Sequence, residues 1–410
     1  MRILFSVQMV DPKQFADEVE SFLRTNAKPL PPSEISWGEG SDSIGNREEL
    51  PKDEERAMIL DAKAWRAVEY DNGFGWLTGP AVYGGRDLPV EFERTYRDMR
   101  SRFDVGSHRP YVISLGMVAP TILAHGTDVV KEAYLRGLFR GELIGCQLFS
   151  EPGAGSDLAS VSTQAVRDGD EWVINGQKVW TSGAQYADIG ELLCRSNMSV
   201  PKHRGLSAFV VDMRAPGVEV RPLRTMTGGA PFNEVFFNDV RIPDSHRLGD
   251  VDGGWGVAIT TLLGERALGA SPGVFGVEDA LAMLRALVHH LGLSEETLVR
   301  QAVAKAYCGV KTIEYSGLRT DAKRRAGQSP GPEASIFKLS NTEVARTIAS
   351  AAELVLGARL ATDTGEWGTY AWASFVLGVP GMRVAAGTDE IMRNILGERV
   401  LGLPKEPTVG

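Results

Sequence analysis

A glycine-rich turn in the middle of the chain is a place where another molecule could bind. Residues 151–157 read EPGAGSD, so small residues follow Pro152 in immediate succession. Glycine has no Cβ atom, which frees backbone N–H groups and lets a ligand approach the main chain closely. Such a turn suits a phosphate or a flavin ring, although an ordinary hairpin loop has the same composition.

An isolated pair of charged residues is the second feature that could do chemistry. Between Val257 and Val277, in a stretch with a helical pattern, the only charged residues are the neighbours Glu265 and Arg266. Because burying a charge costs free energy, charged residues in such a helix are usually paired or functional. The residues alone leave both a salt bridge and a proton-transferring carboxylate open.

The glycine-rich turn must be held by β-structure, because hairpin signals follow it. Asp168-Gly169 and Asn175-Gly176 are both typical of two-residue hairpin loops, and alternating residues flank the second pair. We therefore expect residues 146–182 to form antiparallel β-structure.

Helical patterns occupy the chain on both sides of a β-rich middle part. Runs of strands set between runs of helices predict segregated layers, and hence an α+β fold rather than a parallel βαβ sheet. We expect a helical domain at 1–142, a β-domain at 143–250 and a second helical domain at 251–410.

The composition is typical of a globular, soluble protein. The chain has 410 residues, 43% of them apolar, and a net charge of −9. This charge argues against a general nucleic-acid or anionic-membrane surface, so any phosphate-bearing ligand must be met locally. No apolar run approaches membrane-spanning length, and the first residues lack a signal-peptide core. We expect a cytoplasmic protein.

Cysteine and histidine usage predicts neither disulfides nor a metal site. Cys146, Cys194 and Cys308 are odd in number and widely spaced, which fits a reducing compartment. The adjacent His289 and His290 would point in different directions on a helix.

The string from Cys146 to Ser182 is far more specific as a whole than its parts. It resembles the flavin-binding signature of the acyl-CoA dehydrogenase family, with SEPGAGSD followed by NGQK and WTS at that family's spacing. The likeness extends from the YGG at 83–85 to the GERVLGLP at 397–404. The resemblance implies an acyl-CoA dehydrogenase fold with an α-helical N-terminal domain, a middle antiparallel β-domain and a C-terminal four-helix bundle.

The resemblance also implies the reaction, the oxidation of an acyl-CoA thioester to the trans-2-enoyl-CoA in lipid metabolism. This needs a base for the α proton, hydrogen-bond donors for the thioester oxygen and an acceptor for the β hydride. Side chains cannot accept a hydride, so FAD, through its N5 atom, is the implied cofactor. By alignment, the residues around the flavin are Gln147, Leu148, Phe149, Ser150, Gly155, Ser156, Trp180, Thr181 and Ser182.

Some of these residues have more definite implied roles. Ser150 would bond the pyrimidine edge of the flavin, Trp180 would pack on the ring, and Ser182 would reach N5. Ser156 would also approach the pantetheine arm of the substrate.

The catalytic base cannot stand where many family members carry it, because Ala386 occupies the position of the Glu before Gly-Thr. Its backbone N–H would still help hold the thioester oxygen. Other members carry the catalytic Glu directly before an Arg on the first long helix of the C-terminal domain, which Glu265-Arg266 matches. We expect burial to raise the pKa of Glu265 towards neutrality and Arg266 to orient the substrate site. Asp389 and Glu390 are alternative bases.

Four further positions match family residues that contact FAD away from the flavin ring: Arg325, Gly357, Thr388 and Glu390. Arg325, or alternatively Arg324, would reach the pyrophosphate of a neighbouring subunit, and Glu390 would lie near the adenosine portion. Leu354 and Ala358 replace the Gln and the second Gly of the family's Gln-x-x-Gly-Gly tract, so only a backbone role near Gly357 carries over.

Cross-subunit contacts of this kind imply an oligomer. A homotetramer is the first expectation and a heterotetramer with a homologous chain the alternative, with an electron-transferring flavoprotein as electron acceptor. Two other functions stay open: a low-activity subunit that binds FAD or acyl-CoA, motivated by Ala386, and an oxygen-using oxidase or monooxygenase. The sequence leaves the acyl group undetermined.

Overall fold

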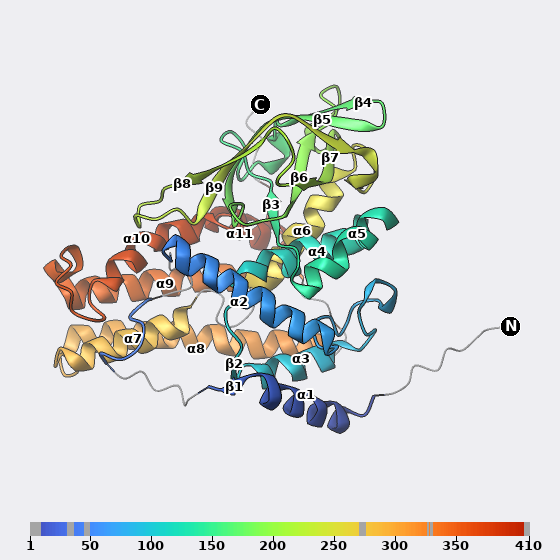
Figure 1. The fold of residues 1–410 in the computed structure, drawn as a ribbon. Helices are drawn as coiled ribbons and strands as arrows, with labels where there is room; N and C mark the ends of the chain where they lie inside the picture. Colours follow the sequence, from blue (N-terminus) through green and yellow to red (C-terminus); the bar gives the residue numbers. More distant parts are fainter. Residues whose placement is uncertain are drawn as a thin grey trace.

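The computed structural model describes residues 10–30, 37–44, 50–269, 276–325, 328 and 331–405. Figure 1 shows a helical N-terminal part, a β-sheet (green) on one side of the molecule, and a helical C-terminal part (yellow to red). The expected α+β fold class is therefore confirmed. Within the described ranges, no helix is both long enough and apolar enough to cross a membrane.

The N-terminal part is built from short and medium helices around an aromatic core. Its elements are α1 (Pro12–Asn26), β1 (Lys28–Pro29), α2 (Lys52–Asp71), α3 (Val90–Arg100), β2 (Phe103–Asp104), α4 (Ala119–His125) and α5 (Asp128–Arg140). A π-helical turn, η3 (Ser114–Val118), leads directly into α4. Phe15 of α1 packs edge-to-face on Phe92 of α3, with ring centroids 4.9 Å apart.

The middle part is one mixed sheet of strands β3 (Gly145–Leu148), β4 (Gln164–Asp168), β5 (Glu171–Ser182), β6 (Ile189–Arg195), β7 (Leu206–Asp212), β8 (Val218–Leu223), β9 (Phe232–Pro243) and β10 (Arg247–Leu248). The order is β10-β7-β6-β4-β5-β9-β8, and β3 pairs with β6. Most pairs are antiparallel, but β3–β6 and β4–β6 are parallel. The purely antiparallel expectation for 146–182 therefore missed how its first strand pairs.

One of the two expected hairpins is wrong. Asp168 and Glu171 pair across a tight turn between β4 and β5, as predicted. Asn175-Gly176, however, lies inside the single strand β5, at an irregularity in its pairing with β9. Asn175 donates a hydrogen bond to Asp239 on β9, and a Cβ on Gly176 would lie 2.5 Å from the Thr163 hydroxyl oxygen. The asparagine-glycine pair thus forms a bulge against neighbouring strands instead of a turn.

The C-terminal part begins with α6 (Gly254–Gly269) and continues with α7 (Val277–His290), α8 (Thr297–Arg325), α9 (Ser335–Leu356), α10 (Ala371–Val384) and α11 (Asp389–Ile395). Helices α7 to α10 share one hydrophobic core, with Trp372 fully buried. Helix α6 instead contacts β7, α4, η3 and α9, so it joins all three parts. The predicted helical stretch ran to Val277, but residues 270–275 lie outside the described residues.

Candidate active site

Two hydrogen bonds from β5 to main-chain carbonyl oxygens hold the loop that follows β3. Lys178 of β5 donates to the carbonyl oxygen of Phe149 at 2.9 Å, and the amide of Val179 donates to the carbonyl oxygen of Ser150 at 2.9 Å. The Glu151 amide and the Ala154 carbonyl close the glycine-rich turn itself at 2.9 Å. The loop is thereby fixed beside the strand that carries Trp180.

A buried ion pair completes this attachment. Nζ of Lys178 lies 2.8 Å from Oε1 of Glu151, and neither residue is more than 6% exposed. Burial opposes the charge of Glu151, but Lys178 and the amides of Ser162 and Thr163 outweigh it and lower the pKa of Glu151 to about 2. Neither charged residue was predicted to have a role, although Glu151 lies in the SEPGAGSD motif and Lys178 in the NGQK motif.

Trp180 presents its indole to solvent. Its φ of +62° lies in the left-handed region, at an irregularity in the β5–β9 pairing, and the side chain is 56% exposed. It packs edge-to-face on Phe232 at 5.7 Å. Among the described residues, the buried Oγ1 of the adjoining Thr181 has no hydrogen-bond partner. An exposed aromatic face beside an unpaired hydroxyl fits a flat, polar-edged ligand such as a flavin.

The other residues expected around the flavin fall into two groups. Leu148 and Phe149 are buried in two separate hydrophobic cores, so only their main chain could meet a ligand. Gln147, Ser150 and Ser182 are partly exposed, and Gly155 and Ser156 are exposed. A Cβ on Gly155 would meet open space, which leaves its backbone accessible.

Glu265 lies near the end of α6 and is partly buried. Burial raises its pKa to about 7, against the opposing attraction of Arg266. Burial, and to a smaller extent repulsion from the Arg399 guanidinium, lower the pKa of Arg266. The site therefore combines a carboxyl that titrates near neutrality with positive charge.

Close backbone contact fixes the part of α6 that carries Glu265. A Cβ on Gly264 would lie 2.6 Å from the carbonyl oxygen of Gly116 in η3. In return, the side chain of Leu268 lies where a Cβ on Gly116 would be. Glycine at both positions lets the two segments touch, so the carboxyl is held on a helix with little freedom to shift.

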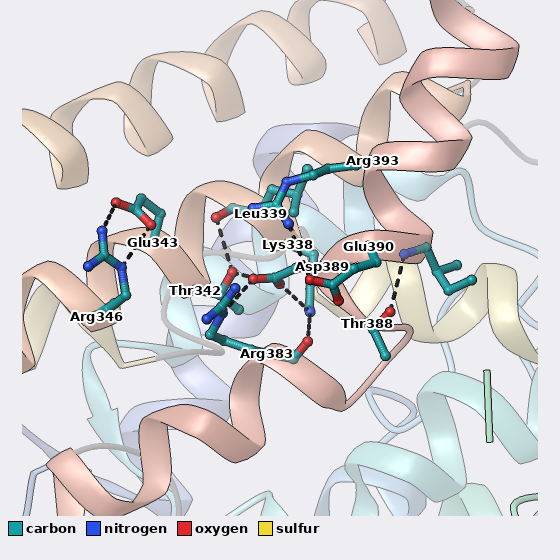
Figure 2. Close-up of polar contacts among 11 residues, drawn as sticks. Lys338, Leu339, Thr342, Glu343, Arg346, Arg383, Thr388, Asp389, Glu390 and Arg393 are labelled. Carbon is teal, nitrogen blue, oxygen red and sulfur yellow. Dashed lines mark hydrogen bonds and ion pairs between the residues drawn. The ribbon is translucent and has the colours of Figure 1, made fainter. Parts of the chain in front are cut away.

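The turn between α10 and α11 carries Ala386, whose φ of +57° is also left-handed. A cluster around Asp389 holds this turn (Figure 2). Asp389 accepts from Lys338 at 2.7 Å, from Arg383 at 2.8 Å and from Thr342 at 3.1 Å. Although burial opposes its charge, these donors lower the pKa of Asp389, which argues against it as a base.

The remaining predicted contacts lie further along the C-terminal part. Thr388 caps α11 by accepting from the Ile391 amide at 3.2 Å, and Glu390 is exposed, 3.5 Å from Arg393. Gly357 ends α9 with a φ of +51°. Arg325 is the last residue of α8, but its side chain and that of Arg324 lie outside the described residues.

The fold and the exposed Trp180 beside the unpaired Thr181 hydroxyl fit a flavin-binding protein, and the comparisons with known proteins give the family. The model of the acyl-CoA dehydrogenase middle domain matches residues 146–240, and that of the acyl-CoA dehydrogenase C-terminal domain matches residues 252–401.

Two of the relatives from Mycobacterium tuberculosis illustrate the likeness. Acyl-CoA dehydrogenase FadE34 is 36% identical over 329 residues, which cover 80% of this chain and 44% of FadE34. Acyl-CoA dehydrogenase IpdE1 is 33% identical over 353 residues, which cover 86% of this chain and 90% of IpdE1. The chain thus spans less than half the length of FadE34 and most of IpdE1.

Among the solved structures that share the fold over nearly the whole chain are a steroid ACAD and the ChsE4-ChsE5 complex. The Tcur3481-Tcur3483 steroid ACAD has a TM-score of 0.74 and 25% identity, covering 96% of this chain and 97% of that one. The ChsE4-ChsE5 complex of Mycobacterium tuberculosis has a TM-score of 0.72 and 27% identity, covering 99% and 100%. The chain belongs to the acyl-CoA dehydrogenase family, whose members are FAD-dependent oxidoreductases. The predicted family, enzyme class and cofactor are confirmed at this level.

Proposed function

We propose that this protein is an FAD-dependent acyl-CoA dehydrogenase in which Glu265 removes the α proton of the substrate. The observation that carries the proposal is the position of Glu265 on α6, where burial raises its pKa to about 7, a value that suits a general base near neutral pH. Ala386 cannot take a proton, and the alternative Asp389 is held in ion pairs. FAD, when bound, supplies the acceptor for the β hydride.

The other residues of the candidate site bind and orient the flavin and the substrate. Trp180 packs on the flavin ring, and Ser150 and Ser182 offer hydroxyl groups to its edge. The backbone N–H of Ala386 holds the thioester oxygen and so stabilises the charge that develops as the α proton leaves. Arg266 adds positive charge to the substrate site. Electrons leave to an electron-transferring flavoprotein.

For the acyl group we propose a bulky, polycyclic type. The support is the likeness to a steroid ACAD over 96% of this chain. The likeness to the ChsE4-ChsE5 complex supports a hetero-oligomer, as does Leu354, which is 49% exposed where the family carries a Gln. A second candidate function follows from the same residue: a subunit that completes a partner's FAD site and has little activity alone. Flavin retained by the chain purified alone would count against this candidate.

The test follows the visible absorption of the flavoprotein under anaerobic conditions while acyl-CoAs, including steroid-derived ones, are added. We expect one class to bleach the oxidised flavin and Glu265→Gln to slow bleaching by about 10²–10⁴-fold at unchanged flavin content. Below pH 7 the parent rate should fall about tenfold per unit, because protonation removes the base.

Glu132→Gln is the matched control, since Glu132 is an exposed carboxylate on α5. It should bleach at the parent rate. A Glu265→Gln protein that bleaches equally fast would exclude Glu265 as the base.

A further inference from the structure

A second carboxyl group is buried next to α6 and has no role in the reaction described above. Glu191 lies on β6 between Ile189 and Leu193, which share its face of the strand and belong to the core that also contains residues of α4 and α6. Glu191 is fully buried. An apolar residue at this position would avoid the cost of burying a carboxyl group.

Glu191 connects three elements through hydroxyl groups. Its Oε1 lies 2.5 Å from Oγ1 of Thr261 on α6, which lies 2.9 Å from Oγ1 of Thr121 on α4. Thr121 in turn donates to the carbonyl oxygen of Met117 in η3 at 2.9 Å. The sheet, α4, η3 and α6 are thus joined by one chain of hydrogen bonds.

The three links from Glu191 to Met117 can form together only if Glu191 is neutral, because Thr261, whose Oγ1 also lies 3.2 Å from the carbonyl oxygen of Val257, has a single proton to donate. A protonated Glu191 donates to Thr261, Thr261 donates to Thr121, and Thr121 donates to Met117, so each hydroxyl donates once. An ionised Glu191 would need the Thr261 proton, and one link would be lost. Within the described ranges, no cation pairs with Glu191, and its Oε2 has no partner. Burial raises the pKa of Glu191 to about 8, in agreement with a neutral acid.

Thr261 stands one helical turn before Glu265, so the two side chains are neighbours on α6. The same η3 segment that receives the Thr121 hydrogen bond also touches Gly264 through Gly116. We propose that Glu191 is a positioning residue: through Thr261 it fixes the turn of α6 that presents the Glu265 carboxyl to the substrate. This inference rests on the proposed function of Glu265.

The test compares variants of the flavin-loaded protein. Glu191→Met keeps the length of the side chain but removes the link, whereas Glu191→Gln stays neutral and still donates to Thr261. We expect Glu191→Met to slow anaerobic flavin bleaching about tenfold or more, because small misplacement of a reacting group is costly. Its flavin content should not change, and Glu191→Gln should stay within about threefold of the parent.

Hydrogen–deuterium exchange gives a readout that does not depend on activity. Amides of residues 261–266 should exchange faster in Glu191→Met than in the parent and in Glu191→Gln. If Glu191→Met does not fold, Thr261→Val breaks the same link at constant volume and should give both effects. The matched control is Thr260→Val, because the Thr260 hydroxyl contacts His125 instead, at 2.7 Å.

Parent-like bleaching and exchange in Glu191→Met and Thr261→Val would overturn the inference, as would an equal slowing in Thr260→Val. Glu265→Gln is measured alongside. If it bleaches like the parent, the proposed function fails, while the exchange data still decide whether Glu191 anchors α6.

Discussion

Two buried carboxyl groups of the middle part, one in the glycine-rich loop and one on β6, are held in opposite ways. Glu151 lies 2.8 Å from the Lys178 ammonium group and accepts from two backbone amides, so its pKa is about 2 and it is charged. Glu191 meets a single hydroxyl group, so its pKa is about 8 and it is neutral. Both side chains have little exposed surface, and their partners differ.

The difference in charge between Glu151 and Glu191 corresponds to the different segments that they hold in place. The Glu151 pair attaches the glycine-rich loop to β5, where a strong charged contact stabilises an otherwise irregular segment. Glu191 lies behind the helix of the proposed base. A second negative charge there would oppose the ionisation of Glu265, whereas a neutral acid does not. The ion pair of Glu151 therefore attaches the loop to the strand, whereas the protonated Glu191 adds no negative charge near α6.

Replacing Lys178 should have the largest effect on stability, because it removes the partner of Glu151. Lys178→Met leaves Glu151 buried without its cation and should lower the free energy of unfolding by about 3–5 kcal/mol. Chemical denaturation measures this loss. Lys202→Met is the control, because its pair with Asp157 is exposed and should contribute about 1 kcal/mol or less.

The double variant Glu151→Gln/Lys178→Met should recover most of this loss, because no unpaired charge remains. A double variant as unstable as Lys178→Met alone would show that the ion pair is not the cause.

The pH dependence of the free energy of unfolding tests whether Glu191 is neutral in the folded protein. Glu191 takes up a proton on folding, because its pKa rises from 4.5 to about 8. Its contribution is therefore fully present below pH 4.5 and is lost as pH rises towards 8. Relative to Glu191→Gln, the parent should lose about 2.5 kcal/mol between pH 5 and pH 7. Equal pH dependence in both proteins would mean that Glu191 is charged.

The smallest expected effect concerns the close packing of α6 against η3 at Gly264. Gly264→Ala places a methyl group against the Gly116 carbonyl oxygen and should destabilise the protein by about 1–3 kcal/mol. Gly256→Ala lies on the same helix in open space and should stabilise it by about 0.5–1 kcal/mol. Thermal unfolding distinguishes the two signs. Effects of equal sign would argue against the close contact of α6 with η3.

The local sequence predicted much of the fold and the elements that carry the candidate site. The β-rich middle part between helical parts, the Asp168-Gly169 turn and the apolar helix with Glu265 were all visible in it. Asn175-Gly176 was misread, because the bulge depends on Thr163 and Asp239, which belong to other segments. Glu191 was missed, because a single Glu in a strand gives no sign of which side chains will surround it.

By itself, the sequence determined the family and the residues available for chemistry, since motif spacing and residue type are local properties. Only the tertiary structure decided which carboxyl groups are charged. Glu151 and Lys178 are 27 residues apart, and Glu191 and Thr261 are 70 apart. Protonation depends on burial and on partners, and both are set by segments that meet only when the chain has folded.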